Sequence, residues 1–190
     1  MKRKVFLAGA LFMALGMIGL LGQPASTQGP EGAVLTGVWY WQCVLPPAMF
    51  GPNAVVPSLY TFHNDGTVTA SNSLAFGGLP LAYSPYTYTP FYGVWERTGP
   101  HEFTMTILSL RFYRTPGDFA GILSGILRSR TTITFADDFD HLAGTEHVDS
   151  LACPTPLTCP DPLLAPAASW VPWPTGPISF HAARISVVPY

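Results

Sequence analysis

The stretch GVWERTGPHEF, Gly93 to Phe103, contains an apolar run that leads through a Gly-Pro turn into a second run. This pattern predicts two strands joined by a polar turn. The same Gly-Val-Trp also occurs earlier in the chain, at Gly37. Glycine at the start of a strand allows a bend or a close approach, which a large indole ring often requires. Because the residues that follow, YWQC and ERTG, differ, we interpret the two copies as strands of one core and not as a functional duplication.

The chain beyond residue 28 has the same β character. Proline is frequent, helical periodicity is missing, and β-branched or aromatic runs alternate with turn residues. Asn64-Asp65-Gly66 is the strongest hairpin signal. The expected strands are 37–44, 57–63, 66–72, 91–97, 102–113, 119–136, 143–152 and 178–188.

The connections between these strands alternate in length. Long segments rich in proline and aromatic residues (44–56, 73–90 and 153–177) follow the first, third and seventh strands. In an up-and-down meander these long segments share one end of the sheet. We therefore predict an all-β fold: an eight-stranded antiparallel up-and-down barrel with long loops at one end. A two-sheet sandwich is the alternative.

The first 28 residues have the layout of a secretory signal peptide. Lys2, Arg3 and Lys4 precede the apolar run VFLAGALFMALGMIGLLG, and small residues suited to cleavage follow, near Ala25 to Thr27. An uncleaved membrane anchor is the alternative. No cysteine stands where a lipid-modified one would. We expect a secreted or periplasmic protein in which residues 29–190 form a single barrel domain.

The composition limits the partners of this expected mature chain. Three of the nine Lys and Arg residues precede it, which leaves six arginines against 11 acidic residues and no lysine after Lys4. An acidic chain without a basic run disfavours nucleic acid and anionic membranes as partners. Glycine motifs for nucleotides are missing as well. We expect no cofactor and no metal, and the oligomeric state stays open.

Three cysteines follow the signal peptide. An exported chain is expected to use cysteines in disulfides. The segment CPTPLTCP favours a local bridge between Cys153 and Cys159, within a proline-rich insert at 153–177. A bridge from Cys43 to either of the others is the alternative.

Trp39 and Arg184 are expected to lie together at the closed end of the barrel. Trp39 begins the first strand and Arg184 lies on the last, so a guanidinium over the indole would seal that end by a cation–π contact. A Gly-x-Trp near the mature N-terminus with an arginine on the last strand resembles the lipocalin (calycin) signature. The sequence also resembles small exported bacterial proteins of lipocalin-like form and unestablished function, through FHNDGTV at Phe62 to Val68 and GVWERTG at Gly93 to Gly99.

Residues for ligand binding are expected at the open end. Arg111 and Tyr113 share one face of a strand, with a spacing that resembles the Arg-x-Tyr by which fatty-acid-binding barrels hold a carboxylate. Solvent exposure of this arginine is the alternative. Apolar loop residues at a barrel end suggest a lid, a plug or a contact surface. The aromatic candidates are Phe50, Tyr83, Tyr86, Tyr88, Phe91, Trp95, Trp170 and Trp173.

Weak catalytic candidates lie on the last two strands. His147 and Asp149 share one face, and an even register would place His181 beside Asp149. Such a cluster could act as a general acid and base or bind a metal ion, although a surface ladder of hydrogen bonds is the more ordinary outcome.

The leading functional hypothesis is a barrel that binds a small apolar or amphipathic molecule. The alternatives are an enzyme of the cyclase or isomerase type, similar to allene-oxide cyclases and dirigent proteins, and a protein-interaction module.

Overall fold

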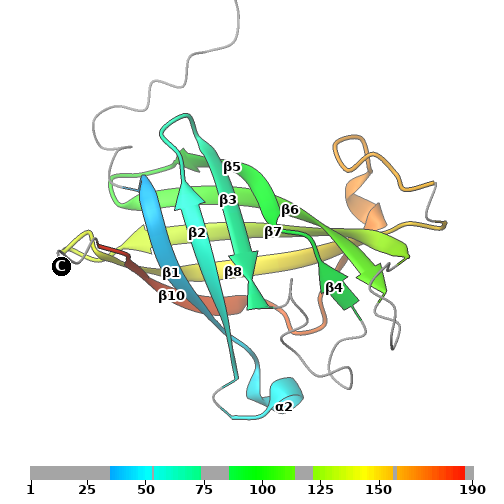
Figure 1. Ribbon diagram of the computed structural model, residues 1–190, viewed down its shortest axis with the longest axis horizontal. Coiled ribbons are helices and arrows are strands. Elements are labelled where there is room, and N and C mark those ends of the chain that lie inside the picture. Colours follow the sequence, from blue (N-terminus) through cyan, green and yellow to red (C-terminus); the bar gives the residue numbers. More distant parts are fainter. Residues whose placement is uncertain (1–34, 53, 74–85, 114–121, 156–157, 187–190) are drawn as a thin grey trace, which may run out of the picture.

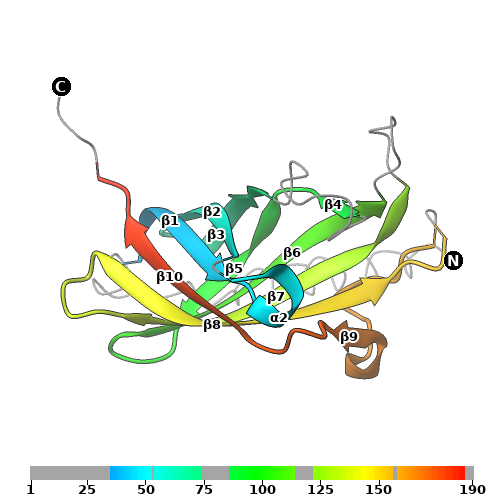
Figure 2. The same ribbon diagram turned by 90° about the horizontal axis from the view of Figure 1, so that it is seen from below.

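The structure is a computed structural model that describes residues 35–52, 54–73, 86–113, 122–155 and 158–186. It is an all-β protein whose eight main strands close into an antiparallel barrel, as predicted (Figures 1 and 2). These strands are β1 (Gly37–Val44), β2 (Val55–Phe62), β3 (Thr67–Asn72), β5 (Phe91–Arg97), β6 (Glu102–Tyr113), β7 (Leu123–Phe135), β8 (His141–Ala152) and β10 (Ile178–Arg184).

Four short elements complete the described chain. Strand β4 (Tyr86–Tyr88) pairs with β6, and strand β9 (Trp170–Pro172) pairs with β8. The helix α2 (Pro47–Phe50) follows β1, and the 3-10 turn η3 (Ala167–Ser169) precedes β9. Segments this short show no periodicity, so the sequence does not predict them.

The barrel closes through β10, which pairs with β1 on one side and β8 on the other. Trp39 lies opposite Arg184 at one end of this pairing, which we call the closed end. At the other end β1 finishes and β10 begins, with Val44 opposite Ser179. We call this second end the open end. An eight-stranded barrel closed in this way leaves no free sheet edge.

Alternation of side chains along the strands fills the barrel interior. On β1, Trp39 and Trp41 are fully buried, whereas the neighbouring residues Val38 and Tyr40 are exposed. Successive side chains of a strand point to opposite faces of the sheet, so one face of each strand supplies the core. Sequence alternation therefore determines which residues of each strand point inward.

Gly93 explains why the Gly-Val-Trp motif recurs on β5. A Cβ atom at this position would overlap the Thr106 carbonyl oxygen and lie 2.7 Å from the Ile107 Cα of β6. Glycine thus permits a close approach of β5 and β6 that another residue would prevent. Two residues later, the Trp95 indole is buried, and its Nε1 donates to the carbonyls of His63 at 3.1 Å and Thr67 at 3.0 Å.

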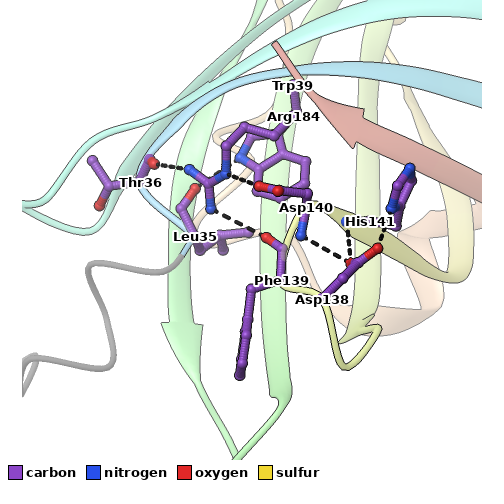
Figure 3. Close-up of polar contacts among 8 residues, drawn as sticks. All are labelled: Leu35, Thr36, Trp39, Asp138, Phe139, Asp140, His141 and Arg184. Atoms are coloured by element: carbon purple, nitrogen blue, oxygen red, sulfur yellow. Dashed lines mark hydrogen bonds and ion pairs between the residues drawn. The ribbon is translucent and has the colours of Figure 1, made fainter. Parts of the chain in front are cut away.

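Arg184 seals the closed end, as Figure 3 shows. Its guanidinium carbon lies 4.4 Å from the centroid of the Trp39 ring. Its Nη1 donates to the Thr36 carbonyl at 2.8 Å, and its Nε lies 3.3 Å from Asp140 Oδ1. Trp39 Nε1 donates in turn to the Leu35 carbonyl at 2.9 Å. The expected cation–π contact is therefore present, and it links the first and last strands of the barrel.

Candidate functional site

A group of polar side chains is buried inside the barrel. It consists of Glu146 on β8, Cys43 on β1, and Ser129 and Thr131 on β7, and we call it the interior polar cluster. The Cys43 thiol donates to Glu146 Oε2 at 3.3 Å. The hydroxyls of Ser129 and Thr131 lie 3.3 Å apart, and Ser129 also forms a hydrogen bond with the Glu146 carboxyl. The cluster thus contains one carboxyl group held by a thiol and a hydroxyl.

The register of the strands brings these groups together. Glu146 lies opposite Thr131 on β7 and opposite Ile178 on β10. Cys43 lies opposite Phe180, the next inward residue of β10. Since Ile178 is the first residue of β10, the cluster lies toward the open end of the barrel, on the half away from Trp39.

Burial changes the acidity of the titratable groups in this region. Burial raises the pKa of Glu146 above its ordinary value, and hydrogen bonds from Ser129 and Cys43 oppose that rise. Burial and the nearby Glu146 raise the pKa of the Cys43 thiol well above its usual range. The same two causes, with Cys43 as a third, raise the pKa of Tyr60. A low-dielectric site favours the neutral form of each acid, so Cys43 is held as a thiol that donates to Glu146 and not as a reactive thiolate.

Trp41 contributes a further polar atom to this interior. Its ring is stacked between Tyr60 and Phe180, with ring centroids 4.4 Å and 4.0 Å away. Its Nε1 lies near enough to Cys43 to counter part of the rise in the thiol pKa. However, this buried Nε1 has no hydrogen-bond partner of normal geometry within the described residues. An unpaired buried donor is costly in a folded protein.

Aromatic side chains lie at the open end beyond the cluster. Phe50 of α2, Tyr86 of β4 and Trp173 after β9 are partly buried and pack against the barrel core. The Trp173 backbone N–H donates to the Val148 carbonyl at 2.9 Å, two residues along β8 from Glu146. Three of the expected aromatic candidates are therefore brought to the end of the barrel that lies nearest the cluster.

The predicted Arg111 and Tyr113 lie farther out, on the part of β6 beside β4. The Arg111 guanidinium carbon lies 4.5 Å from the centroid of the Tyr86 ring, and its Nε donates to Ser124 Oγ at 3.0 Å. Tyr113 packs against Tyr86 with ring centroids 5.3 Å apart and is 46% exposed. Arg111 is thus partly buried and held over an aromatic ring.

The other aromatic candidates have different surroundings. Tyr88 and Phe91 are buried in the main core, and Trp95 lies toward the closed end beside Phe62 and Phe103. Tyr83 lies outside the described residues.

The insert after β8 lies beside the ends of β7 and β8, apart from α2 (Figures 1 and 2). It contains the predicted Cys153–Cys159 disulfide, and Cys43 is a free, buried thiol. Trp170 packs with Ile126 and Leu151 in a second small core, which is separate from the barrel interior. The structure thus places Trp170 away from Trp173, although both belong to the same predicted loop.

The surroundings of Trp170 explain why Asp149 is buried. Asp149 Oδ2 lies 2.9 Å from the Nη2 atoms of both Arg128 and Arg130. The Arg128 guanidinium carbon also lies 3.9 Å from the Trp170 ring centroid. Asp149 therefore takes part in an ion-pair network under the insert.

The proposed His-Asp-His cluster is not formed. His181 lies opposite Ala143 and its Nε2 is 2.7 Å from Gln42 Oε1, whereas His147 lies opposite Arg130. The register guess was wrong because the bend at 173–177 separates β9 from β10, and only β9 lies beside Asp149. No group of three or more His, Cys, Asp and Glu side chains in the described ranges is arranged to hold a metal ion.

Glu146 and Cys43 were missed as site residues. Each has a signal in the sequence, namely a polar residue at a position where alternation predicts an inward side chain. Glu146 alternates with the inward residues Leu142, Gly144 and Val148 on β8, and Cys43 follows the inward Trp41 on β1. A charged residue on an inward face is uncommon without a partner. The predicted candidates His147 and Asp149 lie on the opposite face of the same strand.

The fold places this protein in the class of closed eight-stranded antiparallel β-barrels. No model of a known protein family matches the chain, and no curated protein matches it. Among solved structures, it resembles one described as "Structure of EF1p2_mFAP2b bound to DFHBI", with 12% identity, a TM-score of 0.42, and coverage of 82% of this chain and 97% of that chain. At this level of likeness, function is inferred from the chain's own residues.

The raised pKa of Glu146 predicts how stability depends on pH. The folded state holds the proton more tightly than the unfolded state, so the stabilisation is complete at low pH and is lost as pH rises through the folded pKa. We expect the free energy of unfolding to fall as the pH rises above the ordinary titration range of a glutamate, and to fall less in Glu146→Gln. Urea unfolding of both proteins within and above this range checks the prediction.

The comparison between the two proteins removes the contribution of other groups. Asp65 and Asp138 have lowered pKa values, so their contribution is lost only at more acidic pH. The raised pKa values of Cys43 and Tyr60 place their ionisation at more alkaline pH. Parallel curves for the wild type and the variant would contradict a raised pKa at Glu146.

Proposed function

We propose that this protein is an exported, lipocalin-like barrel that binds a small apolar or amphipathic molecule. The molecule enters at the open end and lies between the interior polar cluster and the aromatic side chains of that end. The observation that carries the proposal is the buried Glu146 carboxyl, which faces inward on the half of the barrel near the open end. Buried polar groups cost stability when apolar residues could replace them, so their presence points to a use.

The side chains around the proposed position suit such a ligand. Phe50, Tyr86 and Trp173 offer apolar surface at the open end, and the polar cluster offers a few hydrogen-bonding groups farther in. Small-molecule sites commonly combine apolar walls with a few placed polar groups. Burial of ligand surface contributes about 25 cal/mol per Å², before the costs of association are subtracted.

Arg111 and Tyr113 are proposed to contact the outer part of an amphipathic ligand. Arg111 is held in place by Ser124 and by the Tyr86 ring, which reduces the conformational freedom that binding would otherwise remove.

The disulfide between Cys153 and Cys159 supports export, because such bonds persist in oxidising compartments. No helix in the described part of the chain is long and apolar enough to cross a membrane.

Titration with the neutral fluorescent probe N-phenyl-naphthylamine tests the proposal. We expect a saturable rise in fluorescence, and binding about tenfold weaker in Trp173→Ala, which removes an aromatic wall. Tyr92→Ala is the control, because Tyr92 lies on the outside of β5 with 61% of its surface exposed. No saturable signal, or equal weakening by both substitutions, would contradict binding in the barrel interior.

A further inference from the structure

We infer that the ligand presents a neutral carbonyl oxygen to the interior polar cluster, where it accepts hydrogen bonds from Trp41 Nε1 and the Glu146 carboxyl. This inference rests on the proposed function, because it names the chemistry of the molecule bound at the same site. It stands on three features of the interior: an unpaired donor, a carboxyl group connected to it through Cys43, and the distribution of positive charge in the described chain.

The first feature is the Trp41 indole N–H. Trp41 is fully buried, and its Nε1 makes no hydrogen bond of normal geometry within the described residues. The other buried indole of β1, Trp39, shows the usual outcome, since its Nε1 donates to the Leu35 carbonyl. Indole nitrogen can only donate, so the group that would satisfy Trp41 must be an acceptor.

The second feature is the carboxyl group of Glu146, which Cys43 connects to Trp41. The Cys43 sulfur lies 3.3 Å from Glu146 Oε2 and also near Trp41 Nε1. A neutral carboxyl carries one O–H donor. A carbonyl oxygen has two lone pairs and no proton, so it can accept from the indole and the carboxyl together. Buried, protonated carboxyl groups are known to donate to substrate oxygens in this way.

The third feature, the distribution of positive charge, disfavours a ligand with an anionic head group. Every arginine in the described residues has partners other than Glu146, so none of these arginines is paired with an anion beside this carboxyl. These partners are Gly99 and Pro100 for Arg97, Ser124 for Arg111, Asp149 for Arg128 and Arg130, and Thr36 and Asp140 for Arg184.

A primary amine is the remaining competitor. It would pair with an ionised Glu146, but it would leave the Trp41 N–H without an acceptor. The described charges and donors therefore favour a ketone, an aldehyde or a quinone over both charged alternatives.

A series of dimethylaminonaphthalene probes that differ only in the head group tests this inference. One carries a propionyl ketone, one a carboxylate, one an aminomethyl group, and the parent carries none. We expect the wild type to bind the ketone about tenfold more tightly than the parent, as two added hydrogen bonds to a buried oxygen allow. The carboxylate and the amine should bind no more tightly than the parent.

Two variants assign the effect to the named donors. Trp41→Phe keeps an aromatic ring but removes the N–H, and Glu146→Leu removes the carboxyl with little change in volume. Each should reduce the ketone's advantage over the parent, measured within the same variant, to about threefold or less. Glu146→Leu should also unfold at the same or a higher urea concentration than the wild type, because a buried polar group has been replaced by an apolar one. The Glu146→Leu variant therefore still tests the inference if Trp41→Phe fails to fold.

The possible outcomes separate this inference from the proposed function. If the parent binds and the ketone binds no more tightly, the carbonyl assignment is overturned but the proposed function stands. The same holds if either variant weakens the binding of both probes equally. If the amine binds most tightly, an ion pair with Glu146 replaces the carbonyl. If none of the four probes binds, the proposed function fails as well.

Discussion

Replacing Trp39 with alanine is expected to lower the free energy of unfolding by about 3–5 kcal/mol, the range for large aromatic residues removed from a core. Trp39 has no exposed surface and packs against the edge of Phe135, with ring centroids 5.6 Å apart. The substitution would also remove the donor to the Leu35 carbonyl and the ring beneath the Arg184 guanidinium. Urea unfolding followed by circular dichroism measures the change.

The control for this prediction is the neighbouring residue on the same strand. Tyr40 is also aromatic but points outward, with 42% of its surface exposed. Tyr40→Ala should therefore change the free energy of unfolding by less than about 1 kcal/mol, as is usual for surface positions. If the two alanine variants were equally stable, the closed end would not contribute to stability in the way the contacts indicate.

Gly93→Ala is expected to destabilise the protein by about 1–3 kcal/mol or more, although it adds only one methyl group. The new Cβ would overlap the backbone of β6 at Thr106 and Ile107, and backbone cannot move away as a flexible side chain can. The two strands must separate locally, which weakens their hydrogen bonds. Thermal and urea unfolding measure the loss.

Gly99→Ala supplies a matched control within the same stretch of sequence. A Cβ atom at Gly99 would come within 3.1 Å of a side-chain oxygen of Glu102, and an exposed side chain can rotate away. We expect a change of less than about 1 kcal/mol. Equal losses at the two glycines would mean that the requirement at Gly93 is not the close approach of β5 and β6.

Much of the fold could be predicted because its signals are local. Alternation of apolar and polar residues gave the bounds of β1, β5 and β6, and Asp65-Gly66 marked the hairpin between β2 and β3. In that turn, Asp65 Oδ1 accepts from the Thr67 backbone N–H at 2.9 Å, and Gly66 has a φ of 84°. Such contacts involve residues that are neighbours in the chain, so composition and spacing are enough to anticipate them.

The candidate site was harder to predict because it depends on distant strands. Cys43 and Glu146 are 103 residues apart in the chain, and they meet only because β10 lies between β1 and β8. Predicting His181 beside Asp149 required the register of β10, which the bend at 173–177 changes. His181 lies opposite Ala143, six residues along β8 from Asp149, so the face was as expected but the position along the strand was not. Local alternation specifies the face of a side chain, whereas the pairing register depends on distant contacts and on the turn before the strand.

By itself, the sequence determined the β class, the bounds of β1, β5 and β6, and the closing pair Trp39 and Arg184. It favoured the local disulfide but left a bridge from Cys43 open. The strands follow from alternation and turn chemistry, and the contact between Trp39 and Arg184 follows from the pairing of the first and last strands in a closed barrel. Only the tertiary structure decided that Cys43 stays out of the disulfide, that Trp170 packs in a separate core, and that Glu146 and not Asp149 faces the interior. The physical reason is that strand register and loop packing are set by many weak contacts between distant residues, and no short segment of sequence contains them.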